Sequence, residues 1–255
     1  MRRVILTVLL MLASTEAYAA SPLDQIRVAV AREKRAGRMP VIVFNIDGTI
    51  FDNRPRSQAI LRDFIAAGGD SYSDIADSIN SLGKDSIDYF VVDSFKTVGV
   101  TDMLFLESAL KFWSDRFFTD EYVQKDMPMD GSASFITEMH DSGAMIVYLS
   151  GRGRTAMMDG TFTSLRMHGF PVATPRTILI LKPNPRDNNE DYKRGAMRDI
   201  SRLGRVVAAF ENDPRSVNLM KRQWPSAKVV MIRAPHAKDA PPVEKNIPII
   251  DSYID

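Results

Sequence analysis

The sequence predicts a doubly wound α/β fold: a parallel sheet of five strands, with helices on its faces and a helical insert after the first strand. Five short apolar runs are rich in β-branched residues and continuous rather than alternating, which is typical of strands buried on both faces of a parallel sheet. Helical patterns separate the later runs, as in alternating strand–helix units. Between the first and second runs lie some ninety residues, from Asn53 to about Gly143, and no ordinary crossover is that long.

The predicted strands are, in chain order, residues 41–44, 145–149, 177–181, 206–210 and 228–232. Helices are expected over residues 132–142, 155–168 and 191–203, and each is followed by a glycine suited to a helix C-terminus. We expect residues 53–127 to form a helical cap over the carboxyl ends of the strands, with Trp113 and Phe117 packing its core. Residues 20–52 and 128–255 then form the α/β core.

The N-terminal nineteen residues have the layout of a secretory signal peptide. Two arginines precede an apolar run over residues 4–13, and Ala17-Tyr18-Ala19 is a small-x-small cleavage site. Polar residues end the apolar run well short of the about 20 residues that a membrane span needs. We therefore expect cleavage after Ala19, export to a bacterial periplasm, and no membrane anchor on the mature chain.

Composition narrows the class of protein further. The 255 residues carry 33 basic and 32 acidic side chains, so charge gives no reason to expect nucleic acid as a partner. Cysteine is absent, which excludes disulfides and thiolate metal sites. A chain of this length buries a full core without cross-links, so export without disulfides is physically reasonable.

Polar residues follow each predicted strand, where ligands of doubly wound sheets bind. The segments are Asn45-Ile46-Asp47-Gly48-Thr49, Ser150-Gly151-Arg152, Lys182 with Lys193 further on, and Glu211-Asn212-Asp213. Carboxylates suit Mg²⁺, a hydroxyl and backbone amides suit phosphate oxygens, and a lysine supplies positive charge. Phosphoryl transfer gains mainly from such positioning and charge neutralisation.

The first segment resembles the Asp-x-Asp-Gly-Thr signature of the haloacid-dehalogenase-like (HAD) phosphohydrolase superfamily, and Leu149-Ser150-Gly151-Arg152 resembles its second motif. Lys193 and Glu211 fall where its third and fourth motifs are expected. The resemblance covers about residues 40–235 and implies a Rossmann-like core, Mg²⁺ as cofactor and a small phosphorylated molecule as substrate.

The resemblance also implies roles for individual residues. Position 45 corresponds to the aspartyl nucleophile, and Asp47 to the general acid and base. The catalytic set is Asn45, Asp47, Ser150 and Lys193; the substrate-binding set is Thr49, Ser150, Gly151, Arg152 and Lys193; the metal set is Asn45, Asp47 (through its carbonyl) and Glu211. Lys182 is the alternative for the motif lysine, because it follows its strand directly.

Asn45 departs from the pattern at the nucleophile itself. An amide is a poor nucleophile, and removing a nucleophile from a cooperative catalytic unit costs on the order of 10⁶ in rate. The sequence thus predicts a phosphomonoester hydrolase impaired at position 45, or alternatively an inactive protein that binds a phosphorylated ligand or a protein partner. A natural pseudoenzyme, a deliberate Asp→Asn change and a mechanism through another carboxylate such as Asp47 all remain open.

Overall fold

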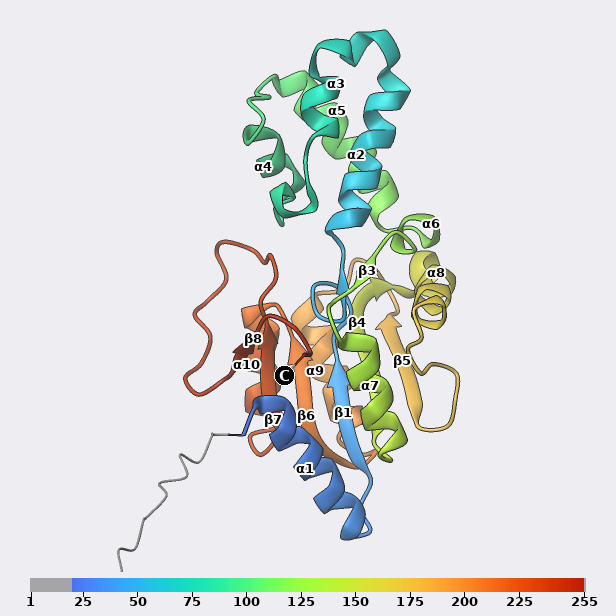
Figure 1. Cartoon of the computed structure of the whole chain (residues 1–255), viewed down its shortest axis with the longest axis vertical. Coiled ribbons are helices and arrows are strands. Elements are labelled where there is room, and N and C mark those ends of the chain that lie inside the picture. Colours follow the sequence, from blue (N-terminus) through green and yellow to red (C-terminus); the bar gives the residue numbers. More distant parts are fainter. Residues whose placement is uncertain (1–19, 255) are drawn as a thin grey trace, which may run out of the picture.

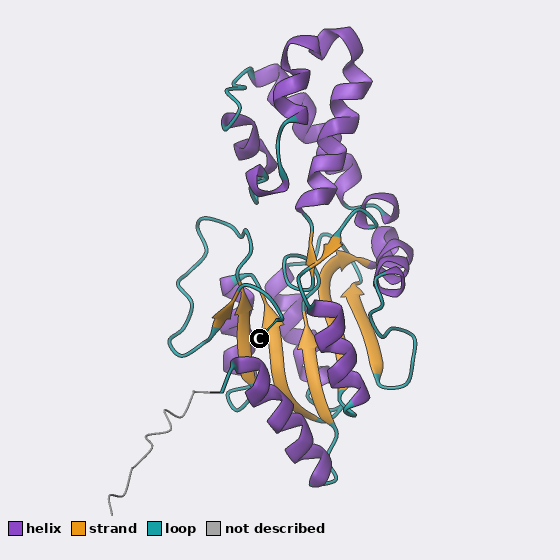
Figure 2. Ribbon diagram, in the orientation of Figure 1, coloured by secondary structure: helices purple, strands orange, loops and turns teal. Residues whose placement is uncertain are grey.

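The computed structural model describes residues 20–254, and a six-stranded parallel sheet forms the centre of the molecule (Figures 1 and 2). Its spatial order is β5-β4-β1-β6-β7-β8. The bounds are β1 Pro40–Phe44, β4 Met145–Gly153, β5 Thr177–Lys182, β6 Arg205–Glu211, β7 Lys228–Ile232 and β8 Ile249–Ile250. The predicted α/β fold with a parallel sheet is confirmed, because all five apolar runs are strands of this sheet.

The sheet has one strand more than the five predicted. β8 pairs with β7 through Met231↔Ile249 and Ile232↔Ile250, at the edge of the sheet. It is only two residues long and follows a proline-containing segment, so its sequence carries no periodic signal. Pairing with a strand already in place, rather than local propensity, makes these residues extended.

The winding of the chain reverses at β1. From β1 the chain passes to β4 and then β5 on one side, whereas β6, β7 and β8 follow on the other side. The carboxyl ends of β1 and its two neighbours therefore border the crevice where doubly wound sheets bind ligands. Asn45 is the first residue beyond β1 and lies in that crevice.

Alternate side chains of the strands pack on opposite helical layers. Ile42 and Phe44 of β1 face a cluster that includes α1 (Pro22–Arg35), α7 (Ser132–Asp141) and α8 (Arg154–Met167). Val41 and Val43 face the other cluster, with α9 (Asn189–Ile200) and α10 (Pro214–Gln223). Each fully buried side chain of this size contributes about 1.5–3 kcal/mol, so both layers hold the strand ends in fixed positions.

Residues 53–127 form a helical unit beyond the carboxyl end of the sheet (Figure 2). Its helices are α2 Arg54–Gly68, α3 Ser73–Asn80, α4 Val91–Lys96, α5 Met103–Phe117 and α6 Asp120–Val123, with 3₁₀ turns at Gly69–Tyr72 and Lys84–Ser86. The unit has an apolar cluster of its own, in which Phe64, Phe95 and Phe105 are buried. The chain enters and leaves it through β2 (Phe51–Asp52) and β3 (Met127–Pro128), which pair antiparallel.

The part of the chain that the structure describes has no helix that combines the length and apolar character needed to cross a bilayer. The predicted signal peptide, residues 1–19, lies outside the described residues.

The insert is seated on the core where α6 meets α8, at Gly160. Its N–H donates to Asp120 Oδ1 over 2.6 Å, and a Cβ here would lie 2.2 Å from the carbonyl oxygen of Asp120. We expect Gly160→Ala to lower the free energy of unfolding by about 1–3 kcal/mol, although alanine is the better helix former. Urea unfolding monitored by circular dichroism measures this.

The matched control is Gly195→Ala in α9, where a Cβ meets nothing within 4 Å. This change is expected to raise stability by about 0.4–1 kcal/mol, because it restricts only the unfolded chain. Equal effects of the two substitutions would contradict the close approach at Gly160.

Candidate active site

Asn45 is held in place by the loop that follows β1. Its backbone N–H donates to the carbonyl of Phe210 on β6 (3.0 Å), and its Nδ2 donates to the carbonyl of Asp47 (2.8 Å) and contacts Thr49 Oγ1 (3.2 Å). Gly48 turns the loop with a φ of 67°, and a Cβ there would lie 2.4 Å from the Asn212 side chain. The glycine therefore lets the loop approach the end of β6.

The end of β6 and the start of α9 supply a lysine–carboxylate pair beside Asn45. Lys193 Nζ lies 2.6 Å from Glu211 Oε2, and both side chains are buried. Glu211 Oε1 accepts the backbone N–H groups of Asn212 (2.9 Å) and Asp213 (3.2 Å). Both carboxylate oxygens of Glu211 thus have protein partners.

The two candidate lysines lie in different surroundings. Lys193 lines the cavity next to Asn45 and also donates to Ser216 Oγ (3.2 Å). Lys182 instead donates to the carbonyl of Asp187 (3.1 Å) and to Asn189 Oδ1 (2.8 Å), and it does not line the cavity. The geometry therefore gives Lys193 access to a ligand and gives Lys182 a role in the loop after β5.

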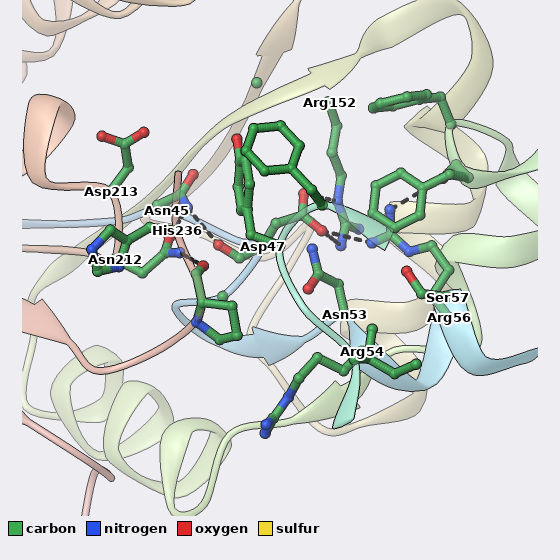
Figure 3. A pocket seen from close by; sticks show the side chains of 18 of the residues that line it. Asn45, Asp47, Asn53, Arg54, Arg56, Ser57, Arg152, Asn212, Asp213 and His236 are labelled. Carbon is green, nitrogen blue, oxygen red and sulfur yellow. Dashed lines mark hydrogen bonds and ion pairs between the residues drawn. The ribbon is translucent and has the colours of Figure 1, made fainter. Parts of the chain in front are cut away.

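The cavity has a volume of about 400 Å³ and lies between the strand ends and the insert (Figure 3). Asn45, Asp47, Gly151, Arg152, Lys193 and Glu211 of the predicted site line it. Thr49 and Ser150 are buried behind the wall instead: Thr49 Oγ1 contacts Asn45, and Ser150 Oγ accepts the backbone N–H of Arg152 (3.2 Å). These two hydroxyls support the loops of the site.

Two carboxylates and two guanidinium groups form a mostly buried ion network where the insert joins the core. Arg152 of β4 contacts Asp47 through Nε and Nη2 (both 2.9 Å), and its Nη2 also reaches Asp126 Oδ2 (2.5 Å). Arg56 of α2 contacts Asp47 Oδ1 (2.6 Å) and forms a bidentate pair with Asp126. Figure 3 shows Arg56 and Arg152 both pointing at Asp47.

Sequence reasoning gave Arg56 no more weight than any arginine near a strand end, and it missed Asp126. Arg56 stands close behind a strand end, which is a weak signal because surface arginines are common. Asp126 lies 70 positions further along the chain from Arg56, and nothing local to Asp126 marks it as a partner. Their pairing exists only because β2 and β3 bring the two ends of the insert together.

The network controls the protonation of Asp47. Burial raises the pKa of Asp47, but the charges of Arg152 and Arg56 outweigh it and hold the pKa well below its usual range. Burial raises the pKa of Asp126 more than the same two arginines lower it. A general acid works best with a pKa near the operating pH, so Asp47 in this arrangement is a poor proton donor. Asp47 is equally unsuited to replace the nucleophile, because both of its oxygens are paired.

The residues around position 45 fit Mg²⁺ poorly. The Asp47 carbonyl accepts Asn45 Nδ2, and an amide atom of Asn212 lies 2.9 Å from it and 3.0 Å from Glu211 Oε1. These two acceptors are the shortest contacts of that amide atom, which favours nitrogen at this position. Two amide N–H groups therefore occupy the carbonyl that the family resemblance assigned to a metal. Mg²⁺ is usually bound through one or two carboxylates. Glu211 is paired with Lys193, and Asp213 Oδ1 accepts the backbone N–H groups of Arg215 and Ser216 at the start of α10.

The described residues contain no group of three or more His, Cys, Asp or Glu side chains placed to hold a metal ion. The predicted metal set depends on an amide at position 45 and a carbonyl at position 47, and neither adds a negative charge. We derive no chemical step through a metal.

No family model matches the sequence, and no curated protein matches it. Among solved structures, the chain is similar to CbbY from Rhodobacter sphaeroides in complex with phosphate, at 14% identity over 83% of this chain and 93% of that chain, with a TM-score of 0.48. It is also similar to a haloacid dehalogenase-like family hydrolase from Streptococcus pneumoniae, at 12% identity over 76% and 85% of the two chains, with a TM-score of 0.46.

A third similar structure is the class C acid phosphatase from Bacillus anthracis with tungstate bound, at 18% identity over 80% of this chain and 72% of that chain, with a TM-score of 0.44. One of the three is named for the superfamily that the sequence motifs resemble.

The ion network is testable through Arg152. We expect Arg152→Met to lower the free energy of unfolding by about 3 kcal/mol, because it leaves the buried Asp126 with only one guanidinium partner. The control is Arg154→Met, two residues away and exposed, which should stay within about 0.5 kcal/mol of the unaltered chain. Urea unfolding of the three proteins separates the outcomes, and equal stability of both variants would contradict a structural role for the network.

Proposed function

We propose that the chain is a HAD-like phosphohydrolase by descent, whose pocket binds a phosphate monoester and hydrolyses it poorly or not at all. One observation carries the proposal: a single cavity is lined by residues from three strand ends and from helix α9. These residues are Asn45, Arg152, Glu211 and Lys193. This is the set of positions at which the family's four motifs are expected. The arrangement at the winding reversal supports a ligand site there.

Lys193 is the group best placed to meet a phosphate. Its ammonium has three donors, and Glu211 and Ser216 take two of them in the structure. Arg54 also lines the cavity, with its guanidinium paired to Asp52 and Asp85. Amides at positions 45 and 212 repel a phosphate dianion less than carboxylates would, so binding depends less on a bridging cation.

Hydrolysis fails in this proposal for two physical reasons. Asn45 offers an amide where an aspartyl-phosphate requires a carboxylate, and Asp47 is held ionised by Arg56 and Arg152, so it has no proton to give a leaving group. The alternative is that binding is itself the function, with the pocket holding a phosphorylated metabolite or a phosphorylated segment of a protein partner. The paired amides on the Asp47 carbonyl favour it, because they satisfy the site without a metal.

Restoring the carboxylates tests the descent of the site. We expect the unaltered chain to hydrolyse 4-nitrophenyl phosphate at background rate. In the presence of Mg²⁺, Asn45→Asp should raise the rate at least 10³-fold, which is less than the factor on the order of 10⁶ that a nucleophile contributes. The double variant Asn45→Asp/Asn212→Asp should be faster still and should require lower Mg²⁺, because two carboxylates then face the Asp47 carbonyl. Release of 4-nitrophenolate measures the rates.

The control is Asn53→Asp, which adds a carboxylate to the same cavity at the start of α2. It should leave the rate at background. Folded Asn45→Asp and double variants without turnover, together with no binding of phosphate esters by the unaltered chain, would contradict the proposal. Rapid hydrolysis by the unaltered chain would contradict only the proposed loss of hydrolytic activity, and not the proposed binding of a phosphate monoester.

We also propose that the mature protein works outside the cytoplasm, in a bacterial periplasm. Expression with residues 1–19 in a bacterial host should yield a periplasmic protein that begins at Ala20. N-terminal sequencing and the intact mass of the fractionated protein measure this. An uncleaved cytoplasmic chain would contradict it.

A further inference from the structure

The insert covers the cavity with aromatic side chains. Tyr89 and Phe90 precede α4, Trp113 and Phe117 belong to α5, and Phe118 follows α5 directly. All five line the same cavity as Asn45 and Lys193. The expectation that Trp113 and Phe117 pack only the insert's own core is therefore incomplete: Trp113 packs against that core and also faces the cavity.

Three of these rings are far more exposed than the rings buried in the insert's core. Phe118 is 54% exposed, Phe90 51% and Tyr89 47%, whereas Phe95 is fully buried and Phe105 is 7% exposed. The insert thus has room for aromatic side chains in its core, yet leaves these three facing the cavity and its rim. Large apolar side chains gathered around a cavity, with polar groups at one end, are typical of small-molecule sites.

The ring faces are also fixed in position before any ligand arrives. Trp113 and Phe117 stack with centroids 4.3 Å apart, and Trp113 Nε1 donates to Ser57 Oγ over 3.0 Å. The guanidinium of Arg56 lies 4.3 Å from the centre of the Phe117 ring. Because Arg56 is held by the ion network, the network also orients the Phe117 ring. A rigid surface loses less entropy when a ligand stacks on it.

We propose that the ligand is a phosphate monoester whose alcohol part carries a planar aromatic group, with the phosphate near Lys193 and the ring against the aromatic side chains of the insert. The phosphate end rests on the function proposed above, whereas the aromatic end rests on the exposed rings. A cavity of about 400 Å³ falls within the about 300–1,000 Å³ of small-molecule sites, which leaves space beyond the phosphate for a ring.

Binding to the full chain, measured by isothermal titration calorimetry, tests this with matched phosphate esters. The aromatic probes are phenyl phosphate and adenosine monophosphate; the others are octyl phosphate, glycerol phosphate and inorganic phosphate. At least one aromatic ester should bind at least ten-fold more tightly than octyl and glycerol phosphate. Tighter binding of phenyl phosphate identifies an aryl group as the preferred ring, and tighter binding of adenosine monophosphate identifies a nucleobase; either supports the proposal.

Variants locate the ring-binding surface. Phe118→Ala and Phe90→Ala should each weaken the preferred aromatic ester about three- to ten-fold and leave glycerol phosphate within two-fold, as expected for the loss of one aromatic contact. Both side chains are half-exposed, so neither change opens a core. The control is Leu104→Ala, also in the insert, 76% exposed and away from the cavity, which should change neither affinity.

The outcomes separate the two proposals. Equal affinity for all esters, tightest binding of octyl phosphate, or no effect of both phenylalanine variants would overturn the aromatic preference while leaving phosphate binding intact. Absence of binding by every phosphate compound would overturn the proposed function and the aromatic preference together.

Discussion

The ion network of Arg56, Asp126, Arg152 and Asp47 is the interaction on which the rest of this structure depends. It joins the first helix of the insert, the segment that leaves the insert, strand β4 and the loop after β1. A buried charge without a partner costs several kcal/mol, so the four groups hold the four segments in one arrangement. The position of the insert over the strand ends, the ionised state of Asp47 and the orientation of Phe117 all follow from it.

The same network explains why one asparagine has large consequences for chemistry. In a site with a free carboxylate at position 47, the loss of a nucleophile would leave a second acid available. Here both oxygens of Asp47 are committed to guanidinium groups, and Glu211 is committed to Lys193. The amides of Asn45 and Asn212 meet at the Asp47 carbonyl instead. The result is a pocket that keeps its cationic side chains, while the carboxylates of Asp47 and Glu211 are committed to ion pairs.

Sequence patterns predicted the fold well because they report local physics. Continuous β-branched runs such as Val41-Ile42-Val43 mark strands buried on both faces, and all five runs of this kind are strands. They failed at Ile249-Ile250, where an existing sheet edge imposes the extended conformation on two residues. Site residues were found because they follow strands that end together at one edge of the sheet. Asn45 and Glu211 lie at strand ends and Lys193 lies in the helix after β5, and all three line one cavity. Ser150 and Thr49 share that location along the chain, but their side chains turn behind the cavity wall.

By itself, the sequence determined the α/β architecture, the place of the site at the strand ends and the amide at position 45. Each of these follows from the type of residue and from its neighbours along the chain. Only the tertiary structure decided which groups pair. The ion pair of Arg56 with Asp126 joins residues 70 positions apart. The aromatic rings that line the cavity come from separate elements of the insert, and the polar residues that line it come from the core. Such contacts depend on how the chain closes the insert on the sheet, and no local pattern encodes that closure.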